Sequence, residues 1–312
     1  MTSVREKQSL AAELVDTVAR VLGSQPGCRV THEDGIVLTG SFTATVRARE
    51  LTRAAHMQGD PVRVTVRFSN GLPDPNLPDA AEDNPRGMAV KFYLADGSTT
   101  DLVCQSWPVF PAGTPEGFLG LIAAQGEGAA ATEAFLAQHP DIAEATAKIA
   151  AESGQPPLSW ATMAFNSMNA YRLVDADGAG RYVRFTLSPD RGERSLPVEQ
   201  RAAADPRYLM KGVLDELPIH YRVMAQLAHD DDQTTDASKA WPADREWVDM
   251  GSIVMTGPDT ERERNGDVLV NDPMRVTDGI EPSDDPILRI RPLVYGLSVR
   301  RRTGGPRADT SQ

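Results

Sequence analysis

One histidine near the start of the chain, His32, has surroundings that suggest proton chemistry. It lies in the stretch RVTHEDG, three residues after Arg29 and shortly before an alternating apolar segment that begins with glycine. An imidazole gains and loses a proton near neutral pH, so a positioned histidine can act as both general base and general acid. An isolated histidine is more often a packed strand residue, and His32 alone leaves both interpretations open.

A second pair of residues, Arg291 and Tyr295, is separated by four positions in DDPILRIRPLVYGLSVRRR. On a helix this spacing places the guanidinium and the phenol on one face. A free phenol has a pKa of about 10, so its oxygen becomes an anionic ligand only where a metal and a nearby cation favour the charged form. The spacing supports such a role, and a tyrosine anchored by an arginine on a helix surface is the alternative.

The composition favours small-molecule chemistry. The 312 residues include 44 acidic and 32 basic ones, for a net charge of −12, which disfavours nucleic acid and anionic membranes as partners. Two cysteines, Cys28 and Cys104, are too few for a disulfide framework or a zinc site. The first 22 residues have helical spacing with interspersed charges and resemble no signal peptide. We expect a cytoplasmic protein that does not span a membrane.

Strands and helices must position these residues. Alternating β-branched residues predict strands over 35–48, 61–71, 88–97 and 101–110, the last two as a hairpin. Alanine-rich segments predict helices over 114–153. A second hairpin is expected over 169–190, a partly helical stretch over 207–229, and final strands over 251–257 and 267–272. A helix should follow Pro286, which suits a first helical position.

Three separated motifs resemble the haem catalase superfamily. They are RVTHEDG, VTVRFSNG followed by NPRGMAVKFYLADGSTTDLV, and GIEPSDDPILRIRPLVY, and SKAWP before MGSIVM is similar to the family's approach to its late strands. The resemblance covers about residues 29–302 and is weakest between 126 and 159. By its short length the chain resembles the minimal, catalase-related peroxidase branch, without the long amino-terminal arm and carboxyl-terminal helical region of large catalases.

The resemblance implies an α+β fold, a catalase-like antiparallel β-barrel with flanking helices enclosing haem b and its iron. Residues 1–28 would hold an N-terminal helix, 29–303 the haem-binding domain and 304–312 a disordered tail. Catalytic roles fall on His32 as the proton-relaying distal histidine, Ser69 as the hydroxyl that orients it, and Gln105 as the distal amide. Tyr295 matches the iron ligand, a role tyrosine has in catalase.

The remaining matches are cofactor contacts. Arg29, Arg67 and Arg302 resemble arginines that pair with the haem propionates, since two buried carboxylates need paired cations. Arg302 belongs to a run of three arginines that could equally be a solvated charge cluster. Phe118 would stack on the haem face, or pack as a core residue. Arg291 would support the charged form of Tyr295.

Four positions depart from the family pattern. Gln105 replaces an asparagine, which lengthens the peroxide-positioning amide by one methylene, and Cys104 replaces a glycine beside it. Asn84 occupies the place of a channel aspartate, next to Asp83, and Asn169 that of a proximal-side histidine. These departures, with a more open pocket, imply a peroxidase with weak catalase activity.

The predicted reaction reduces hydrogen peroxide or an organic hydroperoxide with a small organic electron donor, in a monomer or homodimer. One alternative is a haem enzyme that rearranges organic or fatty-acid hydroperoxides or performs a biosynthetic oxidation. Another is a non-enzymatic β-barrel carrier of haem or lipid, in which His32 and Tyr295 are structural.

Overall fold

The computed structural model describes residues 4–24, 27–74, 76–263 and 267–304. Its strands are β1 (Gly35–Ala44), β2 (Val62–Asn70), β3 (Arg86–Tyr93), β4 (Thr99–Gln105), β5 (Phe165–Asn166), β6 (Tyr171–Val174), β7 (Gly180–Pro189), β8 (Ile219–Leu227), β9 (Trp247–Pro258) and β10 (Ile280–Pro282). Its helices are α1 (Val4–Leu22), α2 (Val46–Leu51), α3 (Pro115–Glu127), α4 (Ala129–Gln138), α5 (Pro140–Ser153), α6 (Val198–Arg201), α7 (Tyr208–Gly212) and α8 (Pro286–Arg302), with 3₁₀ turns η1 (Ala55–Met57) and η2 (Trp160–Thr162). Residues 305–312, nearly all of the expected disordered tail, lie outside the described residues.

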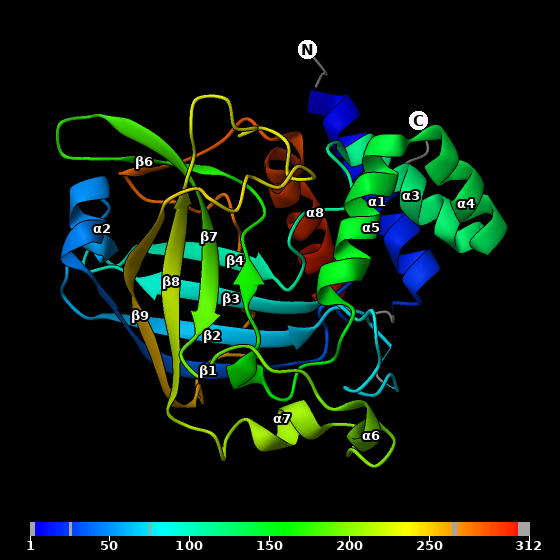
Figure 1. Ribbon diagram of the computed structural model, residues 1–312, viewed down its shortest axis with the longest axis horizontal. Helices are drawn as coiled ribbons and strands as arrows, with labels where there is room; N and C mark the ends of the chain where they lie inside the picture. The colour runs from blue at the N-terminus through cyan, green and yellow to red at the C-terminus, as the bar shows by residue number, and fades with distance from the viewer. Residues whose placement is uncertain (1–3, 25–26, 75, 264–266, 305–312) are drawn as a thin grey trace.

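The strands form an antiparallel barrel (Figure 1). Among the described residues, eight strands close it in the order β7-β5-β4-β3-β2-β1-β9-β8, because β8 also pairs with β7. Strands β6 and β10 extend the sheet beside β7. The predicted α+β fold, an antiparallel barrel with flanking helices, is confirmed.

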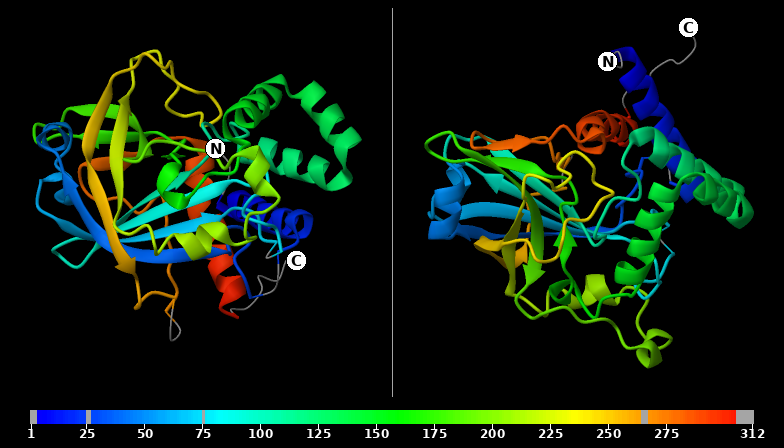
Figure 2. Two further views of the ribbon diagram at one scale, coloured as in Figure 1. Left: turned by 60° about the horizontal axis from the view of Figure 1, so that its bottom comes forward. Right: turned by 45° about the horizontal axis from the view of Figure 1, so that its top comes forward.

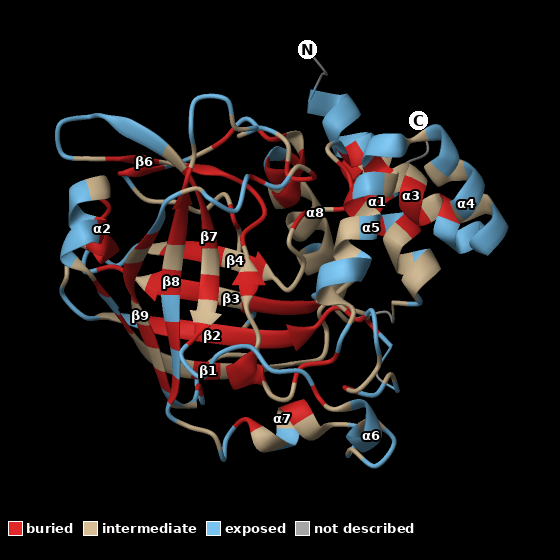
Figure 3. Cartoon of the chain, viewed as in Figure 1, coloured by how far each residue is buried: buried red, intermediate tan, exposed pale blue. Residues whose placement is uncertain are grey.

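The barrel interior is filled by apolar side chains from alternate strand positions. Val66 and Phe68 of β2 are fully buried there, and the Phe68 ring stacks on Trp160 with centroids 5.2 Å apart. Figure 3 shows this burial along the strands. The intervening residues of β2 face the other way, and two of them, Arg67 and Ser69, line a cavity beneath the helices.

Helices α1, α3, α4, α5 and α8 gather at one side of the barrel, while α2 lies at its opposite end (Figures 1 and 2). Helix α1 packs against α3 and α8, while α4 buries none of its residues and is exposed in Figure 3. The N-terminus of α3 is capped by Thr114, whose hydroxyl accepts from the Gly117 amide at 3.1 Å. Within the part of the chain described, we find no helix with the length and apolarity to cross a bilayer.

Three segments differ from the sequence-based expectation. The stretch 207–229 contains only the short helix α7, and Ile219–Leu227 is strand β8, whose odd-numbered residues are all buried. Residues 267–272 form no strand, and Leu269 among them faces a cavity. The strand predicted over 35–48 ends at Ala44, where Thr45 caps the helix α2. In each case, whether the segment forms a strand depends on its pairing partners, which local sequence patterns do not reveal.

Candidate active site

A cavity of about 550 Å³ separates β2–β4 from the helices α1, α3, α5 and α8. Arg67 and Ser69 of β2 reach it from the face of the strand opposite Val66 and Phe68. All nine site residues predicted from the sequence line this one cavity: Arg29, His32, Arg67, Ser69, Gln105, Phe118, Arg291, Tyr295 and Arg302. The structure therefore brings together segments separated by up to 273 positions in the chain, from Arg29 to Arg302.

Strand register places the polar residues of this wall side by side. Ser69 on β2 is opposite Gly87 on β3, and Gly87 is opposite Gln105 on β4. Gly87 has no side chain, and a Cβ there would lie 2.9 Å from both the His32 Nδ1 and the Ser69 Oγ. The glycine thus leaves the gap in which the imidazole sits.

His32 has a left-handed backbone with φ of 58°, a conformation that costs a non-glycine residue about 1–2 kcal/mol. Its amide donates to the Gly71 carbonyl at 2.9 Å, and its carbonyl accepts from Arg67 Nη1 at 2.8 Å. Its Nδ1 shares a 3.0 Å hydrogen bond with the Ser69 hydroxyl. These contacts turn the ring into the cavity and leave Nε2 as the reactive nitrogen.

The His32 imidazole is held in its neutral form. Burial, followed by the charges of Arg67, Arg291 and Arg29, lowers its pKa from the ordinary 6.5 to about 3. A neutral imidazole is able to accept a proton at physiological pH. Anionic groups bound next to these arginines would offset part of the lowering of the His32 pKa.

Arg29, Arg67 and Arg302 form a cationic wall of the cavity. Burial and mutual repulsion lower the pKa of Arg29 to about 9, and burial lowers that of Arg67 to about 10. Glu263 pairs with Arg29 and lies 3.5 Å from Arg67 Nε. That Nε is buried, and no described residue accepts a hydrogen bond from it. The wall thus has an excess of positive charge and an unused donor, which suits an anionic ligand.

Of the arginine run at the end of α8, one member lines the cavity. Arg302 does so and donates to the Leu269 carbonyl at 3.0 Å. Arg301 forms an ion pair with Asp16 of α1, and Arg300 is exposed.

Tyr295 also lines the cavity and lies on α8, seven residues before Arg302. Arg291 donates two hydrogen bonds to its phenol oxygen, from Nη2 at 2.6 Å and Nε at 3.1 Å, as the four-residue spacing predicted. Two donors from one cation stabilise a phenolate, which is the form that binds a metal. The remaining Nη1 of Arg291 donates to Asn169 Oδ1 at 2.9 Å.

This polar chain continues to the start of the same helix. Asn169 donates through Nδ2 to Asp285 at 2.8 Å, and Asp285 caps α8 by accepting from the Ile287 amide at 2.8 Å. Burial raises the pKa of Asp285 despite these donors. Asn169 therefore joins the cap of α8 to the guanidinium that holds Tyr295, so both ends of this helix segment are fixed.

The stacking residue and three of the residues at or beside the positions that depart from the family pattern lie as follows. The Phe118 ring lines the cavity and lies 4.8 Å from that of Phe110. Cys104 is buried, which raises the pKa of its thiol. Asn84 does not line the cavity and accepts from the Leu72 amide at 3.1 Å, whereas the adjacent Asp83 does line it.

Three further residues that shape the site were not predicted from the sequence. Gly87 belongs to the motif NPRGMAV, but its close approach to His32 depends on strand register. Gly35 makes room for Arg67, since a Cβ there would lie 2.7 Å from the guanidinium carbon. Asp285 could have been predicted, because an aspartate directly before a proline is a recognisable signal for the start of a helix.

The helical side of the cavity is apolar. Helices α1, α3 and α5 each contribute a stripe at helical spacing, and the stripes contain no charged side chain: Leu14, Val15, Val18, Leu22, Phe118, Leu121, Ile122, Gln125, Thr146, Ile149, Ala150 and Ser153. A flat apolar ligand with anionic groups at one edge would match both walls. A proton-accepting imidazole and a metal-binding phenol would then face it from different elements.

Comparison with known proteins gives consistent matches. A family model described as Catalase matches residues 12–309. A catalase-related peroxidase of Mycolicibacterium paratuberculosis is 42% identical over 298 residues, covering 94% of both chains. One from Synechococcus elongatus is 28% identical, covering 94% of this chain and 88% of its own.

Larger relatives match over part of their length. The chain is 28% identical to a catalase of Pseudomonas aeruginosa and spans 57% of it. Among solved structures, catalase A from Saccharomyces cerevisiae superposes with a TM-score of 0.76 at 22% identity, over 93% of this chain and 64% of that one. A bacterial catalase gives the same TM-score at 19% identity, over 60% of its chain.

Proposed function

The chain belongs to the catalase family, and within it we propose a haem-dependent peroxidase that reduces hydrogen peroxide or organic hydroperoxides with an organic donor. The observation that carries the proposal is the convergence of all nine predicted residues on one cavity. The names of the two relatives that match over nearly their full length support a peroxidase with weak catalase activity.

The residues present fit haem b. The unpaired Nε of Arg67 and the excess charge of the arginine wall suit two propionates, which Arg29, Arg67 and Arg302 would hold. The Tyr295 oxygen, already hydrogen-bonded to Arg291, would bind the iron, and Phe118 would pack on the ring face. Bound haem would supply the iron at which the peroxide O–O bond breaks. It would also accept the electrons that the organic donor gives up.

The protein's own residues would move the proton. Neutral His32 takes a proton from the peroxide oxygen nearer the metal and returns it to the far oxygen, which leaves as water or alcohol. Ser69 keeps the imidazole ring oriented through Nδ1. Gln105, whose side chain makes no hydrogen bond with any described residue, is free to hold the peroxide.

The apolar stripes of α1, α3 and α5 support organic substrates. Uncharged helix faces along this side of the cavity favour an apolar hydroperoxide or aromatic donor over a charged one. This observation also fits the rearrangement of organic hydroperoxides, in which no donor is consumed. Product analysis separates the two, because a peroxidase forms one alcohol for each two-electron oxidation of donor.

The test uses haem-loaded protein, with dye oxidation and oxygen release measured for hydrogen peroxide and cumene hydroperoxide. His32→Ala should keep its haem and slow the reaction with peroxide about 10²–10⁴-fold. His220→Ala, at an exposed position on β8, serves as the control and should react like the wild type. Haem binding without peroxide consumption would identify a carrier instead, and peroxide consumption without donor oxidation or oxygen release would identify a rearranging enzyme.

A further inference from the structure

We propose that the ion pair between Asp34 and Arg207 positions His32 for the reaction with peroxide, although neither residue lines the cavity. The inference rests on the proposed function, because it concerns the proton transfer assigned to His32. Asp34 and Arg207 are 173 positions apart and are called the positioning pair below.

The His32 segment needs support from outside. Residues 29–34 belong to no helix or strand, and His32 within them has the left-handed φ of 58°. Arg67 braces one side by donating to the carbonyls of His32 and Glu33, both at 2.8 Å. Since Arg67 also forms part of the cationic wall, its own position depends on the ligand bound there, and a second brace is required for a fixed imidazole.

Asp34 supplies that brace at the end of the segment, two residues after His32. Its carbonyl accepts from the Asn70 amide at 2.9 Å, and its Oδ2 accepts from Asn70 Nδ2 at 2.8 Å. Asn70 directly follows Ser69, the hydrogen-bond partner of the His32 ring. Asp34 thus fixes the histidine segment to the strand that carries its partner.

Arg207 is needed because two carboxylates share one neutral donor. Asn70 Nδ2 also donates to Asp79 Oδ1 at 2.7 Å, and Asp79 is fully buried, with its Oδ2 accepting from the Leu209 amide at 2.9 Å. Like charges so close repel each other. The Arg207 guanidinium bonds the remaining Oδ1 of Asp34 and offsets that repulsion at Asp34, while the buried Arg86, which donates to the Asp79 carbonyl at 2.7 Å, offsets it at Asp79. Without Arg207, we expect Asp34 to turn toward solvent and release the His32 segment.

The experiment compares Arg207→Gln, Asp34→Asn and the double variant, all loaded with haem. Arg207→Gln should lower kcat/KM for peroxide about 10-fold, because a small displacement of a proton-transfer group is costly. Asp34→Asn should lose less, because it also removes the repulsion between Asp34 and Asp79. The double variant should lose less than Arg207→Gln, since without the Asp34 carboxylate no repulsion is left for Arg207 to compensate. Haem content and the KM for the donor should stay unchanged, and Arg207→Lys, which keeps the charge, should recover most of the rate.

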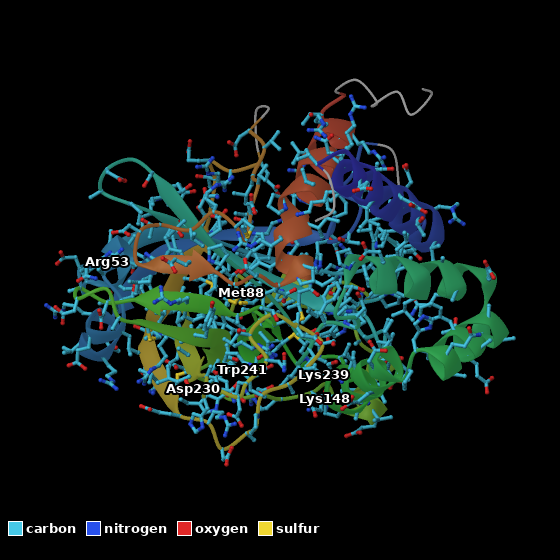
Figure 4. The ribbon with its side chains drawn as sticks, turned by 90° about the horizontal axis from the view of Figure 1, so that it is seen from above. Arg53, Met88, Lys148, Asp230, Lys239 and Trp241 are labelled. Carbon is cyan, nitrogen blue, oxygen red and sulfur yellow. The ribbon has the colours of Figure 1, made fainter. Side chains whose placement is uncertain are left out.

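A matched control removes a similar ion pair elsewhere. Arg53 donates two hydrogen bonds to Asp278, at 2.7 and 2.8 Å, at the end of the molecule opposite α3, α4 and α5 (Figure 4). Arg53→Gln should leave the peroxide rate at the wild-type value. Equal peroxide rates in wild type and Arg207→Gln would overturn the proposal. A lower rate in Arg207→Gln that is fully explained by a lower haem content would overturn it as well.

A second readout needs no activity. The chain has five histidines, so the His32 ring signals can be assigned by ¹⁵N NMR from the His32→Ala spectrum. In haem-free protein, Arg207→Gln should shift or broaden those signals, and Arg53→Gln should not. Unchanged His32 signals in Arg207→Gln would overturn the positioning role. If the wild type failed to react with peroxide, the proposed function would fall, while this measurement would still decide the positioning.

Discussion

The phenol oxygen of Tyr295 accepts two hydrogen bonds from the single guanidinium of Arg291, and these hydrogen bonds fix the position of the proposed ligand oxygen. Arg291 is in turn oriented by Asn169. The amide of Asn169 carries no charge, so it orients Arg291 without forming an ion pair that would compete with the Tyr295 oxygen for the guanidinium.

Tyr295→Phe should abolish the phenolate interaction and lower haem occupancy or change the absorption spectrum, while the fold is retained. The reason is that phenylalanine fills the same volume and lacks the ligand oxygen. Haem titration and the visible spectrum measure the effect. Tyr182→Phe, on β7, is the control and should bind haem like the wild type. A wild-type spectrum and iron content in Tyr295→Phe would reject the ligand assignment.

Gln105→Asn should raise oxygen release from hydrogen peroxide relative to dye oxidation, by a few-fold. Release of oxygen requires a second peroxide held in an ordered place, whereas dye oxidation needs only electron delivery from the donor. A shorter amide should therefore help the first more than the second. The ratio of the two rates at equal haem content decides it, and an unchanged or lower ratio would mean that another feature limits catalase turnover.

At the scale of elements, the strand register brings Ser69, Gly87 and Gln105 into one row, and the His32 ring occupies the gap over the glycine. Gly87→Ala should displace the imidazole and slow the peroxide reaction by about 10²-fold, since a shift of about 1 Å is enough for such a loss. Stopped-flow absorbance after mixing with peroxide measures this. Gly257→Ala, where a Cβ would meet no atom within 4 Å, should match the wild type.

How far sequence predicts this protein depends on whether a feature is local. The spacing of Arg291 and Tyr295 predicted a shared helix face, and α8 confirms that geometry. Strand β8 was expected to be partly helical, although Ile219, Tyr221 and Val223 alternate inward. Its strand character arises from pairing with β7 and β9, which no local pattern encodes.

The site was predicted in the same uneven way. The resemblance to catalases suggested the nine residues, and their placement in one cavity agrees with that expectation. Neither the gap over Gly87 nor the brace from Arg207 could be predicted, because each is a contact between segments whose relative position is set only by the barrel. Residues separated by 173 positions, such as Asp34 and Arg207, show no spacing signal.

At the scale of the whole molecule, a buried histidine unrelated to the cavity affects stability. His56 lies inside the barrel against Phe92, with ring centroids 4.7 Å apart, and burial lowers its pKa from 6.5 to about 4. The unfolded chain therefore binds a proton that the folded chain excludes between pH 6.5 and 4. The associated stability is present above pH 6.5 and is lost as the pH falls toward 4, by roughly 3 kcal/mol.

His56→Phe should accordingly flatten the pH dependence of unfolding in that range. Urea denaturation of haem-free protein at pH 4.5, 5.5 and 7.5 measures the free energy of unfolding. The wild type should lose more stability on acidification than the variant does. His220→Phe, at an exposed position, should behave like the wild type. Parallel pH curves for wild type and His56→Phe would show that His56 does not contribute to acid sensitivity.

The closure of the barrel through β7 and β8 also bears on how the protein behaves when crowded with copies of itself. A ring of strands has no outer strand, so a neighbouring chain finds no row of free backbone groups to pair with. Within the described residues, the sheet order ends outside the ring at β10, which has three residues and finishes at Pro282. Proline has no amide hydrogen, and so short an edge is a poor template for intermolecular β-pairing. We therefore expect the folded protein to resist fibrillar aggregation at high concentration, with any aggregation following the opening of the ring at β5, which pairs with β4 at one position and with β7 at two.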